Sequence, residues 1–155
     1  LVRSRGLGDV YKRQNQERIE RAKANLARVD SVLQRIGESK KLALRNTHQL
    51  EVYEQVAQVV QFSNRAILTL AELDEPSGEK REVAKSKLQQ LESEWTSIQA
   101  KVEEVYGKTR QLDKPAGYIL DQDHHHHLAN QALNFRDWQF YVEGLFLEKV
   151  KKEIK

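Results

Sequence analysis

The sequence predicts an all-α protein: an antiparallel bundle of long helices, with an irregular loop segment and a C-terminal helix. Two observations carry this prediction. Apolar residues recur at steps of three and four over most of the chain, which places them on one side of an α-helix. Short stretches of turn residues separate these periodic segments, and short turns favour antiparallel neighbours. With 155 residues, 39% of them hydrophobic and 32% charged, the chain is long enough for a core yet polar enough for elongated helices.

The first helix is expected over 16–36, with Gly37 as its C-cap, because glycine readily adopts the left-handed conformation that ends helices. A second helix is expected from about Ser39 to Leu73. The predicted inward positions of the first helix are Ile19, Ala22, Leu26, Val29, Leu33 and Ile36. Those of the second are Leu42, Leu50, Tyr53, Val56, Val60, Ile67 and Leu70, with Val52, Val59 and Leu68 widening the face.

A proline- and glycine-containing turn, Asp74–Gly78, precedes the third expected helix, which ends near Tyr106 before Gly107. Residues 134–154 read as a further helix with an apolar band. The predicted inward positions of the third helix are Ala84, Leu88, Leu91, Trp95, Ile98, Val102 and Val105. The same heptad spacing is also compatible with an intermolecular coiled coil, although short turns favour the intramolecular bundle.

The first residues resemble a translated sequencing adapter. The segment 9–14 reads DVYKRQ, which GAT GTG TAT AAG AGA CAG encodes, and that string is similar to a transposon mosaic end used in library preparation. We therefore expect residues 1–14 to be a disordered artefact joined to a fragmentary reading frame, as in metagenomic data. Residues 15–155 would be a helical domain, the C-terminal part of a larger protein.

The segment Tyr106–Asn134 is the irregular part of the chain, combining basic, aromatic, proline and glycine residues. An irregular loop of this kind is usually shaped for a particular neighbour. It suits either binding of phosphate, nucleic acid or sugar, or docking against another domain, and the number of anchoring side chains favours docking. The docking loop comprises Arg110, Lys114, Pro115 and Tyr118. Aromatic anchors are expected at Trp95, Trp138, Tyr141 and Phe146.

Four consecutive histidines, His124–His127, follow Asp123 and raise the question of a metal site. Helical spacing would bring Asp123, His124 and His127 onto neighbouring positions, and imidazole and carboxylate ligate zinc, nickel or copper. However, successive side chains diverge from a regular element, so most of the run is better explained as hydrogen-bonding or solvated histidines. We predict no metal and no cofactor. The carboxylate pair Asp74–Glu75 falls in the predicted turn, where we expect it to be solvated, so no catalytic residue is assigned.

The amino-acid composition excludes or disfavours several functional classes. The chain has no cysteine, which excludes disulfides and thiol catalysis. Its net charge of +3 is spread over alternating lysines and glutamates rather than clustered, so no nucleic-acid partner is expected. No apolar run approaches the length needed to span a membrane, so no membrane partner is expected either.

The layout resembles the C-terminal helical region of family 20 glycoside hydrolases, the β-N-acetylhexosaminidase type. In that family a helix with an aromatic end precedes an Arg-Asn-Arg-Pro-x-Gly-Leu-like loop. The similar elements here are Trp95–Tyr106, Lys108–Arg110 and Lys114–Tyr118. The loop is longer here, Thr109 replaces the asparagine, Tyr118 replaces the leucine, and the His-x-Gly-Gly-Asp-Glu signature of the family is absent.

The resemblance implies a non-catalytic helical domain that supports a (β/α)8 catalytic barrel missing from this sequence. Its partner would be that missing N-terminal catalytic domain of the same polypeptide. The sequence does not specify a cellular compartment, although a bacterial parent enzyme of this kind would be periplasmic or extracellular. The alternative from another class is an independent helical interaction or self-association module, and a histidine-dependent metal protein ranks last.

Overall fold

The computed structural model describes residues 2–73, 79–117, 133–136, 140, 146, 148, 149 and 152, with side chains from Asn15 onward except Lys80. Within these residues lie the helices α1 (Val2–Leu42), α2 (Thr47–Leu73) and α3 (Glu79–Gly107). No strand occurs in these described residues, and the helices pack on one another, so the predicted all-α bundle is confirmed. The chain divides into two compact units, Leu1–Glu94 and Trp95–Lys155, with the division falling inside α3.

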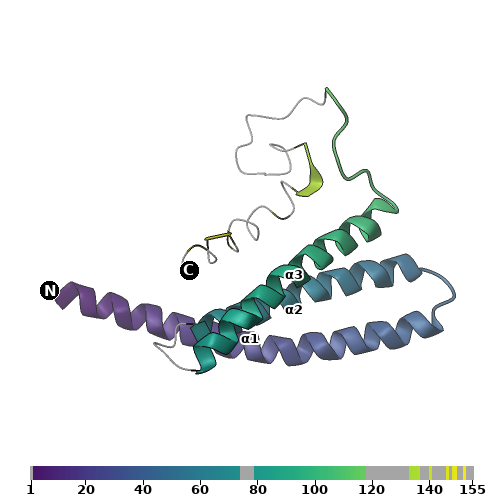
Figure 1. Ribbon diagram of the computed structural model, residues 1–155. Helices are drawn as coiled ribbons and strands as arrows, with labels where there is room; N and C mark the ends of the chain where they lie inside the picture. The colour runs from purple at the N-terminus through teal and green to yellow at the C-terminus, as the bar shows by residue number, and fades with distance from the viewer. Residues whose placement is uncertain are drawn as a thin grey trace. The chain divides into compact units, whose positions relative to one another are not determined.

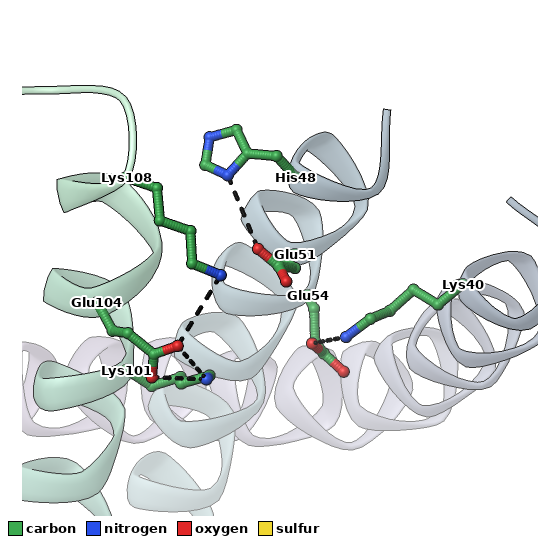
Figure 2. A network of polar contacts seen from close by, with 7 residues as sticks. All are labelled: Lys40, His48, Glu51, Glu54, Lys101, Glu104 and Lys108. Atoms are coloured by element: carbon green, nitrogen blue, oxygen red, sulfur yellow. Dashed lines mark hydrogen bonds and ion pairs between the residues drawn. The ribbon is translucent and has the colours of Figure 1, made fainter. Parts of the chain in front are cut away.

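In the first unit α1 and α2 form an antiparallel hairpin (Figure 1). In the polar contacts between them, later residues of α1 pair with earlier residues of α2. Asn25 Nδ2 donates to Asn64 Oδ1 at 3.4 Å, and Gln61 Nε2 donates to Asp30 Oδ1 at 2.7 Å. Near the turn, Lys40 Nζ lies 2.8 Å from Glu54 Oε2 (Figure 2).

The first part of α3 runs antiparallel to α2. Lys87 Nζ lies 2.6 Å and 2.9 Å from the two carboxylate oxygens of Glu72, and Arg65 forms an ion pair with Glu94. Arg81 Nη1 donates at 2.8 Å to the carbonyl of Leu73, the last residue of α2. This bond satisfies one of the carbonyl groups that every helix end leaves without an intrahelical partner.

The predicted inward faces are confirmed for two of the helices. Every position predicted for α3 is buried, including Ala84 and Val105 at 0% exposure, and those predicted for α1 are buried or half-buried. For α2 the prediction is wrong at Tyr53, Val56, Val60 and Ile67, which are exposed, and at Leu42, which is exposed and belongs to α1. The other predicted positions are half-buried, as expected: Leu50, Val52, Val59, Leu68 and Leu70. The buried positions of α2 are instead Gln55, Ala57, Phe62, Asn64, Ala66, Thr69 and Leu73.

The predicted end of the first helix is also wrong. The chain continues in helical conformation through Gly37 to Leu42, and the turn comprises residues 43–46. Asn46, with φ of 59°, is the left-handed residue before α2. Asparagine tolerates this conformation better than most residues. Its carbonyl accepts the Gln49 N–H at 3.1 Å, so Asn46 belongs to the start of α2 and not to the end of α1. Helix α1 also includes residues 2–14, whose origin as an adapter stays a prediction.

Because Gly37 lies inside a helix, replacing it with alanine is expected to stabilise the protein by about 0.5–1 kcal/mol. A Cβ at this position would meet nothing within 4 Å, so the substitution carries no steric cost. Urea titration followed by circular dichroism measures the change. Gly117, with φ of 81°, is the matched control: Gly117→Ala is expected to destabilise, because that backbone conformation disfavours a Cβ. Equal responses of the two glycines would contradict the assignment.

Candidate interaction surface on helix α2

The solvent-facing side of α2 carries no charged residue. After Thr47, the exposed positions of this helix are Gln49, Tyr53, Val56, Val60, Ser63 and Ile67. Tyr53 is 62% exposed, Val56 49%, Val60 40% and Ile67 37%. A helix at the surface of a globular protein normally places charged or polar residues on its outer side. The outer face of α2, defined by these six residues, is therefore an unusual surface for a solvated helix.

The charges of α2 lie elsewhere on the helix. Glu54 pairs with Lys40 of α1, whereas Arg65 and Glu72 pair with Glu94 and Lys87 of α3. The fourth charged side chain, Glu51, lies 3.8 Å from His48 Nδ1 one turn earlier on the same helix (Figure 2). All of these residues are half-buried. Polar groups thus occupy the seams between the helices, and uncharged side chains are left on the outer face.

A shallow groove of about 570 Å³ lies in the first unit between the three helices. Its apolar lining includes Ile19, Leu68 and Val83, and the Glu72–Lys87 ion pair forms part of its wall. A smaller hollow of about 300 Å³ lies between α2 and α3 and shares Leu68, Glu72 and Lys87 with the groove. The charged side chains around the smaller hollow are paired with each other, Arg65 with Glu94 and Lys87 with Glu72. The groove is lined in addition by Lys23 and Glu79.

The second unit is held by an aromatic cluster. Phe140 lies edge-on to Trp95, with ring centroids 5.3 Å apart, and edge-on to Phe135, with centroids 5.7 Å apart. All three side chains are buried, at 4–5% exposure. Tyr106 extends the cluster, with its ring centroid 6.5 Å from that of Phe135. These contacts attach residues from the C-terminal part of the chain to the end of α3.

Polar contacts reinforce this attachment. Arg136 donates hydrogen bonds to both carboxylate oxygens of Glu103. These hydrogen bonds, together with the negative charge of Glu103, raise the pKa of Arg136 above its ordinary value. The Asp113 carboxylate accepts the backbone N–H of Phe135 at 2.8 Å, and the Lys114 N–H donates to the Leu133 carbonyl at 2.9 Å. On the same length of α3, Glu104 lies 2.7 Å from Lys101 and 3.9 Å from Lys108 (Figure 2). Sequence reasoning did not single out Glu103, Asp113, Phe135, Arg136 or Phe140.

Two members of the predicted docking loop, Arg110 and Lys114, contact their own chain. The Arg110 guanidinium lies over the Tyr106 ring, 5.0 Å from its centroid. Lys114 is half-buried and uses its backbone N–H as described above, and Pro115 is exposed. Tyr118 lies outside the described residues. Whether the loop also docks on another domain stays a prediction.

The structure describes only some of the predicted aromatic anchors and none of the predicted metal candidates. Trp95 is buried within the aromatic cluster, and Phe146 is 42% exposed. Trp138, Tyr141, Asp123, His124 and His127 lie outside the described residues, as does the turn 74–78. Among the residues that are described, no three histidine, aspartate or glutamate side chains lie close enough together to hold a metal ion.

No helix in the described part of the chain is both long and apolar enough to cross a membrane. Comparison with known protein families, with curated proteins and with solved structures found no match to this chain.

Proposed function

We propose that this chain is a non-catalytic helical interaction module whose outer face of α2 binds an apolar helix. The observation that carries the proposal is the exposure of Tyr53, Val56, Val60 and Ile67 on a helix side without charges. Burying apolar surface is the main favourable term in association, and covering these half-exposed side chains contributes about 1 kcal/mol each. An apolar helix is the matching partner, because it can bury the whole row without leaving a charge unpaired.

The spacing of the exposed side chains supports a helical partner rather than an irregular one. Tyr53, Val56, Val60 and Ile67 occupy a heptad pattern in which Ser63 and Leu70 complete the alternation of three and four. A second helix crossing at the shallow angle of coiled coils can place its own side chains between such a row. The helix is already formed in the bundle, so binding does not have to order it.

Binding of an amphipathic peptide tests this proposal. The probe is a fluorescein-labelled helical peptide with leucine at the a and d positions and glutamate and lysine elsewhere. The peptide is used below its own association concentration and is titrated with the full chain. We expect saturable binding that Val60→Lys weakens at least about tenfold, because the ammonium group would be buried in the contact. Fluorescence anisotropy gives the affinities.

The matched control is Ala27→Lys, which adds the same charge at an exposed position of α1. It is expected to leave peptide affinity unchanged, and circular dichroism should show equal helix content in both variants. Equal affinities for the wild type, Val60→Lys and Ala27→Lys would overturn the proposal. Such a result would mean that the peptide binds elsewhere.

The barrel-supporting role implied by the resemblance to family 20 glycoside hydrolases stays a separate hypothesis. It would assign the docking contact to the loop containing Arg110 and Lys114 rather than to α2. An upstream reading frame that encodes a barrel with the His-x-Gly-Gly-Asp-Glu signature would support it. Native coding sequence of another kind upstream would remove it without affecting the interaction surface on α2.

A further inference from the structure

We infer that the apolar helix bound by the outer face of α2 is α2 of a second copy of this chain, packed antiparallel; the inference rests on the proposed function. The lack of charge is the first reason. Partner choice between helices is usually set by complementary charges flanking the apolar row. The outer face of α2 carries none, so two identical faces meet without like-charge repulsion.

The order of residues along the face favours an antiparallel pair. In antiparallel coiled coils, a positions of one helix lie opposite d positions of the other. A twofold axis between residues 61 and 62 therefore sets Tyr53 against the partner's Leu70, and Val56 against the partner's Ile67. The same axis places Val60 opposite the partner's Ser63. Each contact occurs twice by symmetry, as in any isologous interface.

A parallel pair would be poorer at its centre. Parallel packing sets each residue against its own copy, so Ser63 would lie against the partner's Ser63 and bury two hydroxyl groups together. In the antiparallel register each serine faces a valine, and every layer contains at least one apolar side chain. The small serine also lets the two helices approach closely near the axis. The seam from Tyr53 to Leu70 is about 26 Å long at the rise of an α-helix.

The size of this seam predicts a weak, reversible dimer. It is shorter than three heptads, and so short a seam is typical of small, transient protein contacts. We expect a dissociation constant on the order of 10–100 μM, reached because α2 is already folded within its own bundle. Sedimentation equilibrium of the full chain over a wide concentration range measures it. Val60→Lys should weaken dimerisation at least about tenfold, whereas Ala27→Lys should not change it.

Cysteine cross-linking reports the orientation, because the chain contains no cysteine of its own. Val60→Cys and Ser63→Cys are prepared as separate single variants, mixed in equal amounts and oxidised. The antiparallel pair predicts mainly the mixed disulfide between the two variants, which differ in mass and are resolved by mass spectrometry. A parallel pair predicts mainly disulfides between identical variants. Ala27→Cys serves as the control for random collision, and its disulfides should form slowly with either variant.

The outcomes separate this inference from the proposed function. A concentration-dependent dimer with mixed disulfides supports both. Disulfides between identical variants overturn the antiparallel register. A chain that stays monomeric but binds the amphipathic peptide through α2 overturns the second copy as partner and leaves the interaction module standing. A monomer that binds no peptide removes both.

Discussion

Replacing Phe140 with alanine is expected to lower the free energy of unfolding of the second unit by about 3–5 kcal/mol. Phe140 is 4% exposed and contacts both Trp95 and Phe135 edge-on, so its removal opens a cavity at the centre of the aromatic cluster. Edge-to-face pairs add to the burial term, because the positive ring edge meets the negative ring face.

Amide hydrogen exchange measures this loss locally. The N–H groups of Lys114 and Phe135 are hydrogen-bonded to Leu133 and Asp113, so they should lose protection when the cluster opens. Phe140→Leu should retain part of the protection, because it keeps most of the apolar volume. Phe146→Ala is the matched control: at 42% exposure, this side chain should contribute far less. Equal loss of protection in Phe140→Ala and Phe146→Ala would contradict the cluster.

Replacing Gln55 with methionine is expected to raise the free energy of unfolding by about 1–3 kcal/mol. Gln55 is 1% exposed, and its Oε1 atom has no hydrogen-bond partner among the described residues. A buried acceptor without a donor has lost its hydration without compensation. Methionine has nearly the same length and shape and carries no strong polar atom, so it removes this cost and keeps the packing.

Urea titration of the two proteins gives the difference in stability. Gln49→Met, at an exposed position of the same helix, is the control and should change stability by no more than about 0.5 kcal/mol. Unchanged or lower stability of Gln55→Met would indicate that a buried water or another donor satisfies the amide. In that case the glutamine is part of a hydrogen-bond network rather than a cost to the fold.

The helices and the inward faces of α1 and α3 could be predicted because each has one dominant apolar row. For α2 part of the prediction failed, since this helix carries two rows. Phe62, Ala66 and Leu73 share one side with Gln55 and Thr69, whereas Tyr53, Val56, Val60 and Ile67 share another. The second row is more regularly apolar, so periodicity alone selects it. Because the buried row contains a glutamine and a threonine, its sequence pattern does not indicate an apolar face.

The contacts of the second unit were beyond local pattern reading. Asp113 binds the backbone of Phe135, and Glu103 binds Arg136, across 22 and 33 positions of sequence. A single charged residue gives no sign of its distant partner, because any of several oppositely charged residues would serve. The prediction places aromatic anchors at Trp138, Tyr141 and Phe146 but omits Phe135 and Phe140, both of which are buried. Helical spacing does not decide which of several aromatic residues is buried.

The sequence by itself determined that this protein is a bundle of long helices joined by short turns, because apolar periodicity and turn residues act locally. It also determined the chemical character of every helix side, including the charge-free row on α2. Only the tertiary structure decided which of the two apolar rows of α2 is buried. That choice depends on which side chains fit against the neighbouring helices, and on whether the charged residues at the edges can pair, as Arg65, Glu72 and Glu54 do. These are properties of several segments together, so no single segment contains them.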